Sequence, residues 1–165
     1  MKKLLTGLLV AAGLLSVSLL IKTDTVSAHG YVQSPPARGY QGQLDSQSLG
    51  WTAAFNIYGN VISNPQSLEA PKGFPESGPA DGRIASANGG LGQIGDFVLD
   101  NQTSSRWKKT SISTGSNIFT WKYTAPHKTT KWHYYMTKTG WDQNAPLKHS
   151  ELELIGTINH DGSPA

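Results

Sequence analysis

The chain has 165 residues, no cysteine, 14 Lys and Arg residues and 11 Asp and Glu residues, with a formal net charge of +3. This length suits one domain, and the lack of cysteine excludes a disulfide framework and a thiolate metal site. The basic residues are scattered, with no run longer than Lys108-Lys109, so nucleic acid and anionic membranes are not expected partners.

The first element along the chain is an N-terminal apolar segment. Two lysines precede a largely apolar run over residues 4–21, and small residues up to Ala28 follow it. This is the layout of a signal peptide, although the run also has about the length of a membrane anchor. The small-residue site favours cleavage. We therefore expect residues 1–28 to be a signal peptide and residues 29–165 to be a secreted, extracellular domain with no membrane attachment.

Beyond this segment, short runs alternate apolar and polar residues between clusters of Gly, Pro, Asn and Ser, which favours an all-β domain. No helical period is sustained for three turns. The clearest strand covers residues 117–124, with three aromatic side chains on one face. A second strand is expected over residues 131–137 and a weaker third over residues 154–158. The first two are expected to be neighbours, joined through residues 125–130.

The segment over residues 40–101 has a different composition, rich in Gly, Pro, Ser and Asn with scattered aromatic residues. It is too long for an ordinary connection inside a compact domain. Two interpretations remain open: a functional loop region that contains short helices, or a poorly ordered segment.

Two histidines indicate metal chemistry. Cleavage after Ala28 would make His29 the N-terminal residue, so that its α-amine and its imidazole Nδ1 could chelate one metal ion. One further imidazole would complete a planar set of three nitrogen ligands, which suits copper(II) and tolerates copper(I). His127 is the best candidate for that imidazole, because it lies where a strand ends and a turn begins.

Each of these histidines also has an ordinary interpretation, as a residue that follows a cleavage site by accident or as a solvated residue in a turn. The other histidines do not suggest a second site. His133 is expected to decorate a strand, and His149 and His160 to lie on the surface in polar segments.

Several short motifs follow one another along the chain after Ala28. They are His29-Gly30-Tyr31-Val32, Pro65-Gln66-Ser67-Leu68-Glu69, Lys72-Gly73-Phe74-Pro75, Gly78-Pro79-Ala80-Asp81-Gly82, Ile84-Ala85-Ser86-Ala87, Arg106-Trp107, Phe119-Thr120-Trp121-Lys122 and Tyr134-Tyr135-Met136-Thr137-Lys138. In this order and spacing, the chain resembles the bacterial lytic polysaccharide monooxygenases first described as chitin-binding proteins (auxiliary activity family 10, formerly family 33 carbohydrate-binding modules).

The resemblance implies a fibronectin-like or immunoglobulin-like β-sandwich, with a long loop region containing short helices that helps to form a flat binding face. It also implies a copper site in which His29 and His127 are the ligands. Ala125 resembles the small residue that packs beside the copper, and Glu69 resembles an acidic loop residue close to it that is linked to positioning the oxygen co-substrate.

The resemblance is less direct for substrate contacts. Many relatives carry an aromatic residue shortly before the Pro-Gln-Ser motif, but Ser63 and Asn64 occupy the matching positions here. Tyr58 or Trp51 is therefore expected to stack on the polysaccharide instead.

The family pattern also includes strands beyond the region that corresponds to Ile158, with an aromatic residue on the axial side of the copper. None of the phenylalanines of this chain lies at the matching position. We therefore expect the C-terminal strands of the sandwich to be missing, so that residues 29–165 form an incomplete domain with an open sheet edge.

The activity that the resemblance implies is copper-dependent oxidative cleavage of glycosidic bonds in an insoluble polysaccharide, with chitin as the expected substrate. One copper ion would alternate between Cu(I) and Cu(II), with an external reductant and O2 or H2O2 as co-substrate, in a monomeric protein. Two alternatives remain open: a non-catalytic protein that binds chitin or cell-wall glycans, and an exported copper carrier. A serine hydrolase is not expected, because the chain has no Gly-x-Ser-x-Gly motif.

Overall fold

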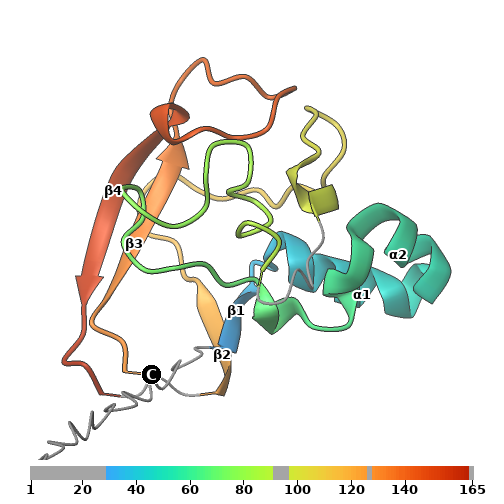
Figure 1. The fold of residues 1–165 in the computed structure, drawn as a ribbon, viewed down its shortest axis with the longest axis horizontal. Coiled ribbons are helices and arrows are strands. Elements are labelled where there is room, and N and C mark those ends of the chain that lie inside the picture. The colour runs from blue at the N-terminus through green and yellow to red at the C-terminus, as the bar shows by residue number, and fades with distance from the viewer. Residues whose placement is uncertain (1–28, 91–96, 126–127, 164–165) are drawn as a thin grey trace, which may run out of the picture.

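The structure is a computed structural model that describes residues 29–90, 97–125 and 128–163 (Figure 1). In the first of these ranges, strand β1 (His29–Ser34) is followed by helices α1 (Arg38–Leu49) and α2 (Trp51–Tyr58) and by the short 3-10 helices η1 (Gly59–Ile62) and η2 (Pro65–Ser67). The later ranges contain η4 (Phe97–Asp100), β2 (Thr120–Ala125), β3 (Lys131–Thr137), η5 (His149–Glu151) and β4 (Leu152–Asn159).

The four strands form two separate antiparallel pairs, β1 with β2 and β3 with β4. The strand expected over residues 131–137 is confirmed with the same bounds. Strand β2 begins later than the expected 117–124 segment, at Thr120, and ends one residue past it, at Ala125. Strand β4 is longer than expected at both ends. Strand β1 was not expected from the alternation of residues.

The expectation that the strands over residues 117–124 and 131–137, which are β2 and β3, are neighbours is wrong. Strand β2 pairs with β1, so that Trp121 lies opposite Val32, and Trp132 of β3 lies opposite Ile158 of β4. An alternating pattern shows which residues share a face of a strand, but it does not identify the strand across the ladder. The partner of β2 is β1, the first strand of the described chain.

The sequence shows no helical period sustained for three turns, yet α1 has 12 residues. Its buried positions are Gly39, Gly42 and Asp45, which recur at a helical spacing but are not apolar. The glycines are needed for close packing. A Cβ atom on Gly39 would lie 2.8 Å from side-chain atoms of Val61 and Leu68. A hydrophobic period therefore could not reveal this helix.

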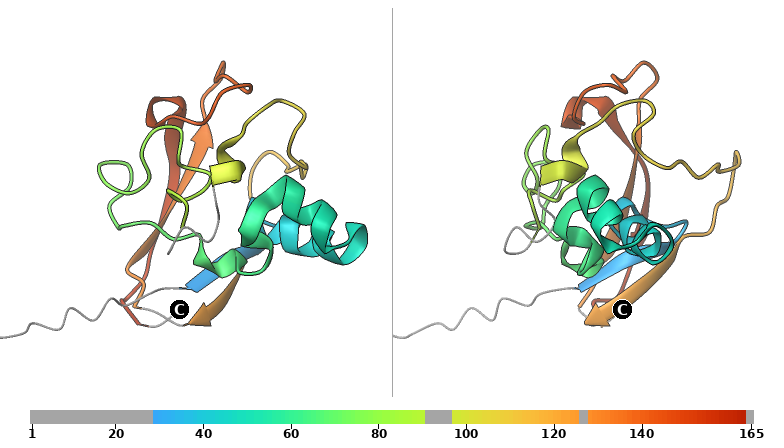
Figure 2. Two further views of the ribbon diagram at one scale, coloured as in Figure 1. Left: turned by 45° about the vertical axis from the view of Figure 1, so that its right-hand side comes forward. Right: turned by 90° about the vertical axis from the view of Figure 1, so that its right-hand side faces the viewer.

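The main core lies beside the helices. Its buried cluster consists of Ala54, Tyr58, Val61, Ile62, Leu99 and Trp107. Figure 1 shows the α1–α2 pair on one side of the molecule and the β3–β4 hairpin on the other, with the loops of residues 68–90 between them. The left view of Figure 2 shows the same separation, and in the right view the helices lie in front of the hairpin. The segment between β1 and β2 thus contributes most of the buried apolar side chains.

The later strands bury much less. Large apolar side chains remain exposed on β2, β3 and β4: Trp121, Tyr123, Met136, Leu154, Ile155 and Ile158. Exposed apolar side chains, where they form a contiguous patch, bind partners or promote association. None of the helices in the described ranges combines the length and the apolar character needed to cross a membrane.

Candidate functional site

The first described residue, His29, also begins strand β1 and lies directly opposite Ala125, the last residue of β2. The hydroxyl of Thr124 donates a hydrogen bond to the backbone carbonyl of His29 over 3.2 Å. The β1–β2 register shifts between His29 and Gly30. Such a bulge turns a side chain away from the direction that the regular ladder would give it.

The imidazole of His29 contacts a carboxylate from a distant part of the chain. Its Nδ1 atom lies 2.9 Å from Oε1 of Glu69, and both side chains are half-buried. Glu69 follows η2 closely, and its backbone N–H donates to the carbonyl of Ser67 over 3.0 Å. The structure therefore brings together three of the residues predicted from the sequence: His29, Glu69 and Ala125.

These residues fit part of a metal site. The imidazole offers a nitrogen donor, the carboxylate adds negative charge beside it, and the methyl group of Ala125 leaves room at the end of the neighbouring strand. The described ranges contain no group of three or more His, Cys, Asp or Glu residues that could hold a metal ion. The second predicted ligand, His127, lies outside the described residues.

The expectation that Tyr58 lies on a binding surface is wrong. Its side chain belongs to the core and is only 4% exposed, and its ring lies 5.5 Å from that of Trp107. The hydroxyl donates to Oδ2 of Asp45 over 2.7 Å. Tyr58 ends α2 on the face that packs against α1, so helix packing directs its ring inward.

The other predicted aromatic contact, Trp51, is exposed. It begins α2, has 56% of its surface accessible and stacks on Phe55 with ring centroids 4.8 Å apart. A flat indole ring held in place by a neighbouring ring has the form needed to stack on a sugar.

A buried carboxylate that the sequence analysis did not single out ties α1 to α2. Asp45 accepts hydrogen bonds of 2.7 Å from Tyr58, from Lys108 and from the side-chain amide of Gln41. Burial alone would raise the pKa of Asp45, but these hydrogen bonds outweigh it and the pKa is lowered. Burial, together with the bond to Asp45, raises the pKa of the Tyr58 phenol. These hydrogen bonds to Asp45 stabilise the packing of α1 against α2.

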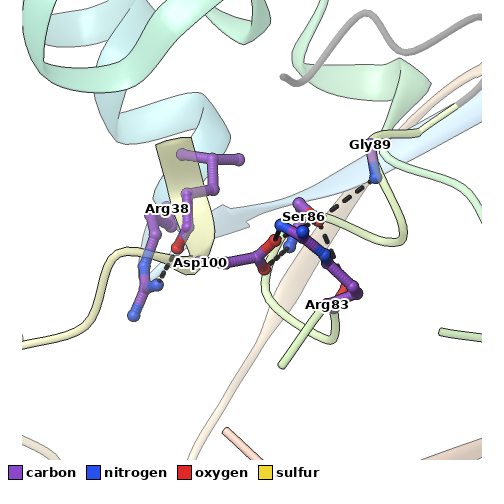
Figure 3. Close-up of polar contacts among 6 residues, drawn as sticks. Arg38, Arg83, Ser86, Gly89 and Asp100 are labelled. Carbon is purple, nitrogen blue, oxygen red and sulfur yellow. Dashed lines mark hydrogen bonds and ion pairs between the residues drawn. The ribbon is translucent and has the colours of Figure 1, made fainter. Parts of the chain in front are cut away.

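A second buried carboxylate, Asp100, organises the loop that follows Asp81 (Figure 3). Its two oxygens accept hydrogen bonds from the backbone N–H and the hydroxyl of Ser86, over 2.9 and 2.8 Å. The Ser86 hydroxyl oxygen in turn accepts from the N–H of Gly89. Arg83 lies 3.4 Å from the carboxylate. The motif that contains Ser86 was visible in the sequence, but its buried partner was not.

Arg38, at the start of α1, links this network to the core (Figure 3). Its guanidinium donates to the carbonyl of Leu99 and to Oε1 of Gln102, over 2.5 and 3.0 Å. It also lies over the ring of Trp107, 4.4 Å from the centroid. Burial lowers the pKa of Arg38 to about 10, with a smaller lowering from Arg106 and an opposing effect of Asp100.

His149 was expected on the surface, but it is a half-buried residue with three partners. Its backbone N–H donates to Oδ1 of Asp81 over 2.7 Å, and its Nε2 atom lies 2.8 Å from the carbonyl oxygen of Pro79. Its ring meets Phe74 edge-on, with centroids 4.9 Å apart. A single histidine in a polar segment gives no indication of such contacts from the sequence.

Comparison with known proteins adds a family match. A family model described as "Lytic polysaccharide mono-oxygenase, cellulose-degrading" matches residues 29–165. GlcNAc-binding protein A of Shewanella oneidensis is 46% identical over 163 residues, which cover 98% of this chain and 31% of that protein. The chain thus spans less than a third of the length of the curated relatives it matches.

Solved structures show the same relationship. A CBM33 protein of Bacillus amyloliquefaciens, in complex with Cu(I), is 63% identical, with a TM-score of 0.81 over 83% of this chain and 76% of that one. The catalytic domain of a lytic polysaccharide monooxygenase of Listeria monocytogenes is 44% identical, with a TM-score of 0.68 over 82% and 74% of the two chains. The expected immunoglobulin-like β-sandwich class is thereby confirmed.

Proposed function

The chain belongs to the lytic polysaccharide mono-oxygenase family, and from this membership we propose that it is a secreted, copper-dependent enzyme that oxidatively cleaves chitin or a related insoluble polysaccharide. The observation that carries the proposal is the meeting of His29, Glu69 and Ala125 at the ends of β1 and β2. A half-buried imidazole next to a carboxylate is a suitable position for a cation, and the solved relative with the highest identity quoted above holds Cu(I).

In this proposal the chain supplies the copper ligands in two steps. Cleavage after Ala28 gives His29 a free α-amine next to its imidazole, and His127 adds the second imidazole. Bound copper would supply one-electron redox chemistry towards O2 or H2O2, with electrons from an external reductant. Nitrogen donors of this kind suit both oxidation states of copper.

The described residues have distinct tasks around this site. The Thr124 hydroxyl and the β1–β2 ladder fix the backbone of His29. Glu69 lies against Nδ1 of the imidazole, the nitrogen that would hold the copper, so its carboxylate would lie next to the bound metal. The small side chain of Ala125 keeps the space beside His29 accessible.

The proposed substrate is chitin, because the relative from Shewanella oneidensis is a GlcNAc-binding protein. Of the two aromatic residues suggested by the sequence, only Trp51 is exposed enough to stack on a sugar. We therefore propose Trp51 alone as an aromatic contact.

A second candidate function is chitin binding without catalysis. It is favoured by the name of the relative from Shewanella oneidensis, GlcNAc-binding protein A, which refers to binding alone. In that case the protein would adhere to chitin through the face that carries Trp51, and the His29 site would not catalyse oxidation.

Mass spectrometry of soluble products from β-chitin, supplied with a reductant and H2O2, separates the two candidates. Oxidised chito-oligosaccharides that disappear in His29→Ala support the enzyme. Retention of the protein on chitin without any oxidised product supports the binding protein and contradicts the proposed activity.

Two simpler measurements test the copper site itself. The intact mass of the secreted protein should correspond to a chain that begins at His29, and any other first residue removes the α-amine ligand. Calorimetric titration with Cu(II) should show tight binding that weakens as the pH falls, because the ligands must lose protons. An unchanged affinity in His127→Ala would exclude that residue from the site.

A further inference from the structure

The β3–β4 hairpin is attached to the rest of the described molecule through loops, since each of these strands pairs only with the other. One attachment is the segment of residues 68–82, which belongs to the green loops that lie against β3 and β4 in Figure 1. Loop and hairpin enclose a groove of about 450 Å³, lined among others by Leu68, Phe74, Tyr135 and Leu152. Because the groove leaves the apolar side chains of loop and hairpin incompletely packed, polar contacts contribute more to holding the loop against the hairpin.

Most of these polar contacts involve His149. A backbone carbonyl can only accept, so Nε2 of His149 carries the hydrogen of the 2.8 Å bond to Pro79. The backbone N–H donates to Asp81 over 2.7 Å, and Nδ1 lies at an ion-pair distance of 3.0 Å from the same carboxylate oxygen. The ring edge against Phe74 adds a contact at the other end of the loop. One side chain thus touches the loop at three of its residues.

Internal hydrogen bonds and close backbone packing join the two halves of the loop. The hydroxyl of Ser77 donates to the carbonyl of Lys72 over 2.7 Å, and the N–H of Ser77 donates to the carbonyl of Gly73 over 2.8 Å. Gly78 lies so close to Pro71 that a Cβ atom there would approach the Pro71 carbonyl oxygen to 3.2 Å. A displacement near Asp81 is therefore transmitted to Pro71, two residues from Glu69.

We propose that His149 is a positioning residue that clasps the segment of residues 70–82 to the β3–β4 hairpin and thereby holds Glu69 against His29. The significance of the Glu69–His29 contact for catalysis rests on the proposed function. The clasp itself does not, because it consists only of contacts between described side chains and backbone groups.

Three contacts survive the loss of the His149 side chain, and one of them is the bond from its own backbone N–H to Asp81. The N–H of Gly82 donates to the carbonyl of Leu147 over 2.8 Å, and the hydroxyl of Tyr135 lies 3.4 Å from the carbonyl of Phe74. Removal of the side chain should therefore loosen the loop without unfolding the hairpin, which makes the proposal testable by substitution.

His160 provides a matched control at the opposite end of β4. Its ring is 28% exposed, close to the 29% of His149, and it also lies beside a carboxylate, Asp161, and a backbone carbonyl, that of Thr129. Among the described residues, His160 forms no hydrogen bond, ion pair or ring contact with the segment of residues 70–82. His160→Ala removes the same kind of ring from the same hairpin without touching the proposed clasp.

The first test measures trypsin cleavage after the exposed Lys72 in the metal-free chain. Opening of the loop exposes this bond, and cleavage follows the population of the open form. His149→Ala should be cleaved about tenfold faster, the effect of losing one net hydrogen bond. His149→Gln should recover part of the protection, because its amide can still donate to Pro79. His160→Ala should leave the rate unchanged. Equal rates in His149→Ala and the unsubstituted chain would overturn the proposal.

The second test follows the side-chain NMR resonances of His29 in the same metal-free samples. They should shift in His149→Ala, return towards their original positions in His149→Gln, and stay in place in His160→Ala. Faster cleavage with unmoved His29 resonances would overturn the positioning role. If His149→Ala does not fold, Asp81→Asn removes the charge of the same contact and should show smaller changes in the same direction. Neither test uses copper or polysaccharide, so a failure of the proposed function would leave these results unaffected.

Discussion

The helical region and the β3–β4 hairpin contain apolar side chains of similar size but bury them very differently. Leu99 of η4 is fully buried, whereas Ile155 of β4 is 58% exposed. Burial of apolar surface stabilises a fold by about 25 cal/mol per Å². Most of the hydrophobic stabilisation therefore comes from the segment between β1 and β2, although the strands define the fold class.

The comparison also concerns how each region uses small and charged residues. In the helical region, glycines permit α1 to approach Tyr58 and Val61, and buried carboxylates hold neighbouring segments together. In the hairpin, Gly156 faces open space. The packed region should consequently respond strongly to changes of a single side chain, and the hairpin should tolerate them.

The largest expected difference is for truncation of an apolar side chain. Leu99→Ala should lower the free energy of unfolding by about 2–5 kcal/mol, because it leaves a cavity in the core. Ile155→Ala should change it by no more than about 0.5 kcal/mol. Urea denaturation followed by circular dichroism measures both. Similar losses in the two variants would show that the strand faces are as well packed as the helical core.

A smaller loss is expected for the buried carboxylate Asp45. Asp45→Asn should cost about 1–3 kcal/mol near neutral pH, since the bonds from Lys108 and Tyr58 lose their charged acceptor.

The same carboxylate should make stability depend on acid. Its pKa is lowered in the folded state from the usual 3.8, so its contribution is complete above that value and is lost as the pH falls through the folded pKa. The difference in unfolding free energy between the original chain and Asp45→Asn should therefore stay constant from neutral pH down to the usual pKa of 3.8 and shrink as the pH falls further. A difference that stays constant below that pH would contradict the assignment.

Glycine substitutions should show opposite signs in the two regions. Alanine normally improves a helix by up to about 1 kcal/mol over glycine. In Gly42→Ala, however, the new Cβ atom would lie 2.7 Å from Cγ of Tyr58, so we expect a net loss of about 1–3 kcal/mol from overpacking. Gly156→Ala should be neutral or slightly stabilising, because no other atom lies within 4 Å of its Cβ position. Thermal unfolding of both variants tests this reversal.

The smallest effect on stability is expected for a polar substitution on the exposed sheet face. Ile158→Lys should alter the free energy of unfolding by less than about 0.5 kcal/mol, yet it should reduce self-association and the binding of a hydrophobic dye. Light scattering and dye fluorescence measure the two properties. A monomeric chain that binds no dye and unfolds cooperatively above about 65 °C would show that these strand faces are covered in solution.

The sequence predicted the strand segments better than their arrangement. Residues 131–134 alternate between exposed and half-buried side chains, so the strand was readable, although the alternation breaks at the register shift between Tyr134 and Tyr135. The pairing of β2 with β1 depends on contacts between distant residues, which no local pattern contains. Helix α1 escaped prediction because its buried face consists of glycine and aspartate.

For the candidate site, family motifs were more informative than local chemistry. They pointed to His29, Glu69 and Ala125, which the fold brings together. Tyr58 was misjudged, because an aromatic residue in a polar segment can face either way and only the packing of α1 on α2 decides. His149 was overlooked, because its partners lie about 70 residues away in the chain.

The β1–β2 ladder has a consequence for the order of folding. The contact between Thr124 and His29 joins residues 95 positions apart, whereas β3 and β4 are joined by the much shorter segment of residues 138–151. Closing a long loop costs more chain entropy than closing a short one, and pairings between distant residues form late. The hairpin should thus form early, and the helical segment must collapse before β1 can find β2. His29 and Ala125 would then meet among the last contacts, so the proposed copper site would form only when folding is nearly complete.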